Sequence, residues 1–171
     1  NSYVTANDKL YALTADGKLT VYTDNEMQNV DATYELGAIS PKGNKAVIAV
    51  DEVNGDIYVC KGENGISKIS NGTASQFYTC PTFTASNKAQ NLEAGKDYVK
   101  GCANGVYVAG NYVYVACGSY GLVVLDKTTG DEICHRKAYN GKSANFVTGD
   151  NDNNIFVAYG QSRVQVFKLT D

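Results

Sequence analysis

The chain has 171 residues, with 15 basic and 18 acidic side chains scattered singly along it and a formal net charge of −3. Because no basic stripe is present to neutralise a phosphate backbone, the composition argues against a nucleic-acid partner. Hydrophobic residues make up 43% and aromatic residues 11% of the chain, with only two prolines, which is typical of a globular, β-rich protein that can bury its own core.

The chain shows no sign of a membrane-spanning or targeting segment. No apolar run approaches the roughly 20 residues that a membrane helix needs. The first residues, Asn-Ser-Tyr-Val-Thr, lack the charged start and apolar core of a signal peptide. Since the chain begins with Asn and not with Met, we expect a mature or trimmed product from which an export signal has been removed.

One sequence pattern recurs four times, and its best copy is Val113-Tyr-Val-Ala-Cys-Gly-Ser-Tyr-Gly-Leu-Val-Val-Leu-Asp126. The other copies begin at Leu10, Ile57 and Ile155, so the spacings are 47, 56 and 42 residues. Each copy has two short runs of Val, Ile, Leu and Tyr around a turn that is rich in residues tolerating positive φ. Periods of 40–50 residues with short strands indicate the blades of a β-propeller.

Each repeat predicts four antiparallel strands, A to D, with B and C forming the repeated hairpin. Strand A is apolar on both faces, which is expected when a sheet lies between two neighbouring sheets. The predicted outer strands D are more polar and cover 30–36, 75–80 and 132–137. The predicted blades cover residues 1–37, 38–82, 101–138 and 142–171 of a single propeller segment.

The last blade ends at Asp171 with strands A, B and C but no strand D, which gives fifteen strands in total. An open three-stranded blade would leave an unpaired edge, which folded proteins avoid. We therefore expect the missing strand to come from further blades of a longer parent chain or from a second copy, in a larger or two-copy ring.

Residues 83–100 break the period and form an insertion between the second and third blades. Residues 86–94 predict a short helical turn, capped by Ser86 and ended by Gly95. Long loops in compact domains are often functional, so the insertion is a candidate binding loop; the alternative is a neutral insertion. Its candidate binding residues are Asn87, Lys88, Gln90, Asn91, Glu93, Lys96, Asp97 and Tyr98.

The five cysteines form neither a zinc pattern nor a disulfide framework, because their number is odd and no C-x-x-C pair occurs. Cys60 and Cys80 would lie two strands apart in one sheet, at about 9–10 Å, which exceeds the reach of a disulfide. Cys102 and Cys117 would be diagonal neighbours on a hairpin, about 7 Å apart, so a disulfide between them is an alternative. Buried free thiols are the main expectation.

Oxygen-bearing side chains at Asp150, Asp152 and Asn154 have the spacing that can begin a calcium loop. The stretch has Ile155 where such a loop has its glycine and Gln161 where it has its bidentate glutamate. We interpret it as an A–B turn and expect no cofactor, with Ca²⁺ at these three residues as the alternative.

Other candidate chemistry has a simpler explanation. Adjacent strand residues point to opposite faces, so Cys134 and His135 are not expected to form a nucleophile–base pair. The glycine pairs at 62 and 65 and at 118 and 121 precede strands and not helices, which favours turns over phosphate cradles.

The A–B turns also carry a group of carboxylates that are expected on one face of the ring. Two of them at about 5.5 or 6.5–9.5 Å could serve a glycosidase, but exposed turns rich in Asp and Asn need no catalytic explanation. These carboxylates are Asp51, Glu52, Asp56, Asp150 and Asp152.

The residues 114–126, Tyr-Val-Ala-Cys-Gly-Ser-Tyr-Gly-Leu-Val-Val-Leu-Asp, resemble the blade motif of bacterial LVIVD-repeat proteins and are similar to YVTN-type surface-layer propellers. The following turn, 126–130, resembles blades of quinoprotein-like propellers. The resemblance implies a toroid of four to eight blades, often on exported or cell-surface bacterial proteins, that binds ligands or partners at a face or in the central channel. Quinoprotein blades lock together through tryptophans, and this chain has none, so a quinone cofactor is not expected.

The sequence therefore favours a non-enzymatic binding or scaffold propeller of an extracellular, cell-surface or periplasmic bacterial protein, with a protein or glycan as partner. The alternative is a propeller hydrolase or lactonase with acidic residues at one face, part of whose site lies outside this chain. A third hypothesis is an oligomerisation ring built from two copies.

Overall fold

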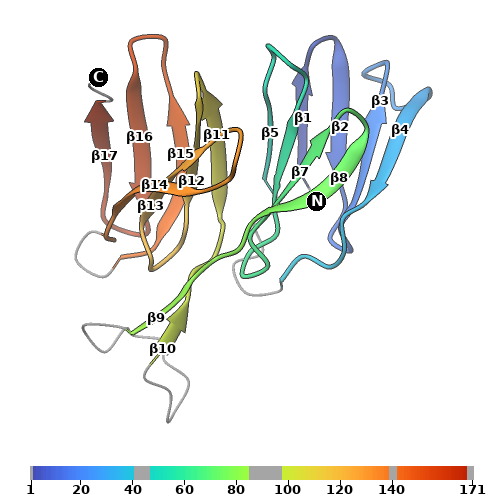
Figure 1. Cartoon of the computed structure of the whole chain (residues 1–171). Helices are drawn as coiled ribbons and strands as arrows, with labels where there is room; N and C mark the ends of the chain where they lie inside the picture. The colour runs from blue at the N-terminus through green and yellow to red at the C-terminus, as the bar shows by residue number, and fades with distance from the viewer. Residues whose placement is uncertain (1, 41–46, 85–97, 139–141, 169–171) are drawn as a thin grey trace.

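The computed structural model describes residues 2–40, 47–84, 98–138 and 142–168. These residues form four large antiparallel sheets in chain order, three with four strands and the last with three, and a small two-stranded sheet between the second and the third. In Figure 1 the fourth and third sheets lie on the left and the second and first on the right. The described residues contain no helix, and the predicted all-β propeller is confirmed.

Strands of each sheet follow one another along the chain, so every connection within a sheet is a hairpin. The first sheet contains β1 (Ser2–Ala6), β2 (Lys9–Leu13), β3 (Lys18–Tyr22) and β4 (Val30–Glu35). The second contains β5 (Ile48–Val50), β6 (Ile57–Cys60), β7 (Ile66–Ser70) and β8 (Thr73–Tyr78). The third contains β11 (Gly105–Ala109), β12 (Tyr112–Ala116), β13 (Leu122–Asp126) and β14 (Glu132–Arg136). The fourth contains β15 (Ala144–Gly149), β16 (Asn154–Tyr159) and β17 (Arg163–Lys168).

The outer strand of the second sheet begins two residues earlier than the predicted strand 75–80. Asn71 and Gly72 have φ values of 49° and 75°, which are the values of a tight two-residue hairpin turn. Because this turn needs no further residues, β8 starts at Thr73.

Each pair of neighbouring sheets shares one hydrophobic core, so the described chain has three successive cores. Strand β6 contributes to two of them: Ile57 and Val59 pack toward the first sheet, while Tyr58 and Cys60 pack toward the third. In β12 the side chains divide in the same way between the second and fourth sheets. Burial on both faces follows from this stacking, as the apolar strands predict.

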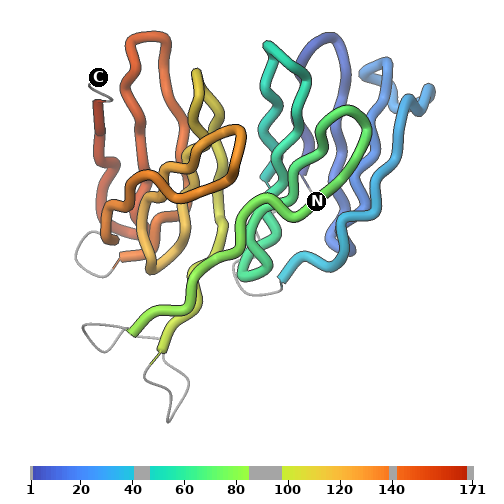
Figure 2. The backbone as a smooth tube through the Cα atoms, viewed as in Figure 1, coloured from blue at the N-terminus to red at the C-terminus, as the bar shows by residue number. Residues whose placement is uncertain are grey.

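Part of the predicted insertion is a two-stranded hairpin, β9 (Thr82–Thr84) paired with β10 (Tyr98–Lys100). The predicted count of fifteen strands was therefore two too low, because five of the six residues in these two strands had been included in the predicted loop 83–100. Figures 1 and 2 show the hairpin projecting from the end of the molecule opposite to the β1–β2 and β15–β16 turns. The predicted helical turn at 86–94 lies outside the described residues.

Candidate functional site

Two of the five carboxylates that were predicted to gather at the A–B turns belong to ion pairs. Asp51 Oδ2 lies 2.8 Å from Lys127 Nζ, and Asp51 Oδ1 accepts the Val53 N–H at 3.1 Å. Asp56 Oδ2 lies 2.9 Å from Lys68 Nζ. Both carboxylate side chains are almost fully buried, at 6% and 8% exposure, so each carries a buried, neutralised charge.

The pKa of Asp56 reflects this setting. Burial by itself would raise the pKa, but hydrogen bonds from Ser70 and Lys68, together with the Lys68 charge, outweigh it and lower the pKa below its usual value. Burial likewise acts to lower the pKa of Lys68, and the Asp56 carboxylate outweighs it and raises the pKa. Asp56 is therefore ionised and Lys68 protonated at neutral pH.

The Lys127–Asp51 pair joins the second sheet to the third, while the Asp56–Lys68 pair lies within the second sheet and positions Lys68 for a contact with the third. Lys68 comes from β7, lies 5.3 Å from the Tyr58 ring centroid and 5.5 Å from that of Phe77, and donates to the Lys127 carbonyl at 3.2 Å. Lys127 follows β13 and reaches back to Asp51 in the second sheet. The arrangement holds neighbouring blades together, so Asp51 and Asp56 have a structural role.

The predicted calcium residues form a turn between β15 and β16. Asp150 Oδ1 accepts the N–H groups of Asp152 and Asn154 at 2.9 and 3.0 Å, and Asp150 Oδ2 accepts from the Asn154 side chain at 2.9 Å. The Asn154 side-chain hydrogen bond, followed by the backbone ones, lowers the pKa of Asp150. Among the described residues, no group of three or more His, Cys, Asp or Glu side chains is placed to hold a metal ion. Calcium binding at 150–154 stays a prediction.

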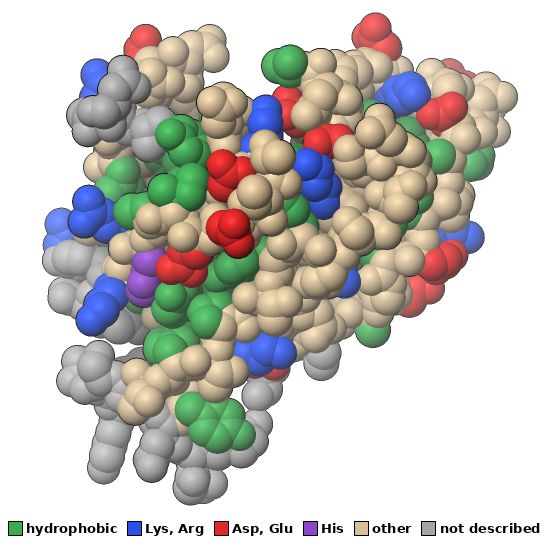
Figure 3. All heavy atoms as spheres, viewed as in Figure 1, with side chains coloured by type: hydrophobic (Ala, Val, Ile, Leu, Met, Phe, Trp, Pro, Cys, Tyr) green, Lys and Arg blue, Asp and Glu red, His purple; other side chains and the backbone are tan. Residues whose placement is uncertain are grey.

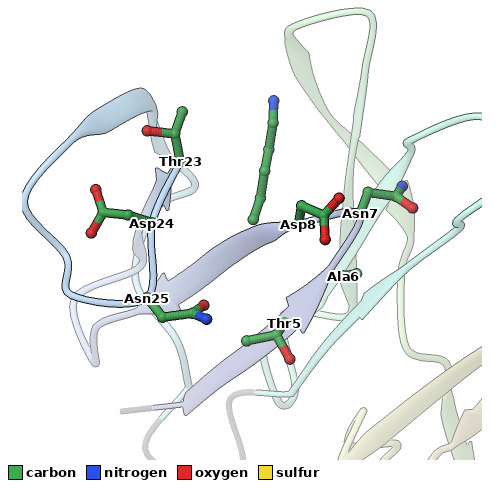
Figure 4. A pocket seen from close by; sticks show the side chains of 8 residues that line it. Thr5, Ala6, Asn7, Asp8, Thr23, Asp24 and Asn25 are labelled. Carbon is green, nitrogen blue, oxygen red and sulfur yellow. The ribbon is translucent and has the colours of Figure 1, made fainter.

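A polar pocket of about 480 Å³ lies on the first sheet and was not predicted from the sequence. Figure 4 shows Thr5 of β1 and Asn7 and Asp8 of the β1–β2 turn on one side of the pocket, with Asp24 and Asn25 of the β3–β4 connection on the other. Asp24 accepts three backbone N–H groups, from residues 26, 28 and 29, at 2.8–3.1 Å. The carboxylate therefore shapes its own loop, which explains its presence without a ligand.

A second hollow, of about 460 Å³, follows the innermost strands of three sheets, and we call it the inner-strand groove. It is lined by β5, β11 and residues of β15, with the turn residues Glu52 and Val53 at its rim. The side chain of Val53 is 92% exposed. The lining residues are 47–53, 106–110 and 146–148.

The described base of the insertion packs on the third sheet through aromatic side chains. Phe83 of β9 lies 5.2 Å from Tyr120, centroid to centroid, and Tyr120 stacks on His135 at 3.8 Å with an interplanar angle of 13°. His135 Nε2 lies 2.6 Å from the Tyr120 carbonyl oxygen, which makes Nε2 the protonated nitrogen. Figure 3 shows this single histidine, in purple, beside acidic and hydrophobic side chains.

Tyr120 is held in this stack by a carboxylate. Its hydroxyl donates to Glu132 at 3.1 Å, and burial followed by this hydrogen bond raises the pKa of Tyr120 to about 12. Of the eight predicted binding-loop residues, seven lie outside the described residues. Tyr98 belongs to β10, and its side chain is 52% exposed.

The chain's relationship to known proteins rests on its third sheet. The family model of the LVIVD repeat matches residues 100–126, which contain β11, β12 and β13. The third sheet carries an LVIVD repeat. No curated protein matches the chain.

Solved β-propellers resemble this chain over nearly its whole length. The β-propeller domain of Cps50 (Swd1) from Myceliophteria thermophila is 13% identical, with a TM-score of 0.65 over 99% of this chain and 53% of that one. BBS1N, solved in complex with ARL6DN, is 19% identical, with a TM-score of 0.64 over 98% and 51%. BamB from Moraxella catarrhalis is 14% identical, with a TM-score of 0.59 over 99% and 44%. The chain thus has the propeller fold and spans about half the length of these propellers.

No helix within the described residues is long and apolar enough to cross a membrane.

Proposed function

We propose that this propeller segment is a non-enzymatic binding module of an exported or cell-surface bacterial protein, and that the inner-strand groove takes an extended segment of a protein partner. The inner-strand groove is the observation that carries the proposal. It follows three successive inner strands, and its lining of Val, Ala, Tyr and Phe offers apolar contact beside backbone groups. Concave surfaces that combine apolar side chains with polar groups are the usual place for ligands.

The charge at the A–B turns favours a partner segment with basic residues. The turn stretches 51–56, 110–111 and 150–153 contain no Lys or Arg. Asp51 and Asp56 are neutralised by lysines, while Glu52, Asp150 and Asp152 are exposed. We therefore expect apolar side chains in the groove, flanked by Lys or Arg at the turns. BBS1N, a propeller neighbour, was solved in complex with a protein, which supports this class of partner.

The alternative enzyme, a hydrolase or lactonase, would need free carboxylates on this face. The ion pairs of Asp51 and Asp56 argue against these two residues as a catalytic pair, because an acid–base pair must exchange protons at working pH. The remaining candidates in this chain are Glu52, Asp150 and Asp152, with further groups supplied from outside it.

The ring itself is completed by further blades of a longer parent chain or by a second copy. The support is the half-length match to solved propellers and the exposure of Phe146, Val164 and Val166 on the last sheet. Measuring the solution mass separates the two sources: a dimer supports the second copy, and a monomer supports further blades.

The binding proposal is tested with a library of extended peptides that alternate apolar and basic residues. A photoreactive amino acid at Val53, at the groove rim, should cross-link peptides, whereas the same residue at the exposed Ile133 of β14 should not. Glu52→Lys should weaken peptide binding about five-fold or more, and Glu35→Lys on the distant β4 should leave it unchanged.

Three results would overturn the proposal. Equal cross-linking at both positions would remove the groove as the site. Glycan-array binding without peptide binding would make the partner a glycan. Hydrolysis of a lactone or glycoside that is lost in Asp150→Asn would make the chain part of an enzyme.

A further inference from the structure

The junction between the second and third sheets contains two facing cysteines. Cys80 lies two residues after β8, the outer strand of the second sheet, and Cys117 directly follows β12 in the third. Their sulfur atoms are 3.5 Å apart, although 37 positions separate them in the chain. Both residues are buried, at 2% and 0% exposure, so the contact belongs to the core shared by the two sheets.

The surroundings leave room for the two sulfurs to approach each other. The residue next to them is Gly101, where a Cβ atom would lie 2.8 Å from Cys117 Sγ and 3.4 Å from Cys80 Cβ. The Cys117 backbone is fixed by a hydrogen bond from its N–H to the Gly121 carbonyl at 2.7 Å. A glycine at position 101 therefore keeps open the space in which a bond between Cys80 and Cys117 would lie.

The other three cysteines occupy different surroundings. Cys60 is buried within β6, Cys102 Sγ lies 3.3 Å from Asn104 Oδ1, and Cys134 is exposed on β14. The odd number of cysteines is thus consistent with one pair and three thiols.

We propose that Cys80 and Cys117 form a disulfide that joins the second and third blades. The bond closes a loop of the chain that begins just before β9 and includes the insertion, so it fixes the base of the β9–β10 hairpin covalently. The oxidant is a disulfide, either a small-molecule disulfide or that of a thiol–disulfide oxidoreductase.

The exchange proceeds in two steps that balance. The Cys80 thiolate attacks one sulfur of the external disulfide and releases one thiolate, which leaves a mixed disulfide on Cys80. Cys117 then loses its proton and attacks the Cys80 sulfur, which releases the second thiolate. Two cysteine thiols are oxidised by two electrons, and the external disulfide is reduced to two thiols.

In the packed chain, the hydrogen bond from Cys117 to Cys80 shifts the pKa values of the two thiols in opposite directions. It lowers the pKa of Cys80 despite burial, and it raises the pKa of Cys117, which burial raises further. In the packed chain Cys80 is thus the more readily ionised of the two thiols. Because both sulfurs are buried there, the exchange takes place before the two blades close on each other, when either thiol can attack first, and the bond is then protected from reduction.

The test is refolding of the reduced full chain in a buffer of oxidised and reduced glutathione, followed by alkylation and mass spectrometry. The product should carry three alkyl groups, against five on the reduced and alkylated chain, and contain one link, between Cys80 and Cys117. No Lys or Arg lies between Cys102 and Cys117, so trypsin leaves both in one peptide, and cleavage after tyrosine is needed to separate them.

The link should raise the Tm of the oxidised chain by about 10 °C over the reduced chain. Cys80→Ser should abolish both the link and the dependence of Tm on reductant, whereas Cys134→Ser should keep both. Two results would overturn the proposal. Cys117 could be fully alkylated after refolding, or it could be linked to Cys60 or Cys102.

Discussion

The junction between the second and third sheets and the open face of the fourth sheet are built from the same repeat but differ in burial. At the junction, Val113, Val115 and Val123 are fully buried. On the face of the fourth sheet turned away from the third, Val164 and Val166 are 57% and 58% exposed. Each blade offers two apolar faces, and only a neighbouring blade decides whether a face is buried.

The junction also has specific polar contacts that the open face lacks among the described residues. The Lys127–Asp51 pair and the Cys80–Cys117 contact cross between the second and third sheets. Apolar burial supplies most of the stabilisation and these contacts fix how the two blades sit on each other. An apolar, unpartnered face of this kind is unusual in a finished protein surface.

The largest expected effect comes from a turn glycine that the outer strand covers. A Cβ at Gly121, where φ is 110°, would lie 2.1 Å from the Arg136 carbonyl oxygen at the end of β14. Gly121→Ala should therefore destabilise the chain by more than about 3 kcal/mol. Gly110→Ala is the matched control, because its φ is 55° and nothing lies within 4 Å, and it should cost about 1 kcal/mol. Urea denaturation measures the unfolding free energy of both variants. An equal loss in Gly121→Ala and Gly110→Ala would show that the close approach of β14 to Gly121 adds nothing to the cost.

The second-largest expected effect is the loss of unfolding free energy when a buried ion pair is broken, compared with the loss for an exposed pair. Lys127→Met leaves the Asp51 carboxylate, only 6% exposed, without its cation and should cost about 2–3 kcal/mol. The control is Lys9→Met, since the Lys9–Asp31 side chains are 41% and 40% exposed, and it should cost less than about 0.5 kcal/mol. Free energies of unfolding for both variants, measured at pH 7, check the comparison. Similar losses would show that the junction gains nothing from burying its charges.

The third effect concerns Asp56 and the acid limb of the stability profile, which is the fall of the unfolding free energy at low pH. Because its pKa is lower in the folded chain than the ordinary 3.8, its contribution is fully present above about pH 5 and is lost as the pH falls through the folded value. Asp56→Asn should flatten this limb of the unfolding free energy, measured from pH 7 to pH 2. Asp131→Asn in the exposed β13–β14 turn is the control. An unchanged acid limb in Asp56→Asn would contradict the proposed effect of the Lys68 contact.

The smallest effect belongs to the open face. Val166→Thr should change the unfolding free energy of the monomer by less than about 0.5 kcal/mol, because the side chain is 58% exposed. Val115→Thr at the junction should cost about 1–3 kcal/mol, since it buries a hydroxyl. A large loss in Val166→Thr, accompanied by dissociation of a dimer in solution, would show that a second copy covers this face.

The positions of most strands could be predicted, because short runs of Val, Tyr and Ile alternate with turn residues along the chain. Strand and turn preferences of this kind depend only on local geometry. The hairpin β9–β10 was missed because its two strands have only three residues each and pair across a long loop. The ion pairs of Asp51 and Asp56 were missed for a different reason. Their lysines come from β7 and from the turn after β13, and no local pattern links them to the acids.

The cysteines show the same limit. Register within one hairpin makes Cys102 a neighbour of Cys117, with the Cys102 N–H 3.5 Å from the Cys117 carbonyl oxygen. The Cys80 sulfur reaches Cys117 from the next blade, which only the packing of two sheets decides.

The sequence by itself determined a chain of propeller blades, their order and the LVIVD repeat in the third, because strand and turn preferences act over a few residues. The tertiary structure decided which carboxylates are neutralised, which thiols meet and which apolar faces stay open, because these depend on how one sheet stacks on the next. The inner-strand groove belongs to this second group, since it exists only where the inner strands of three blades lie side by side.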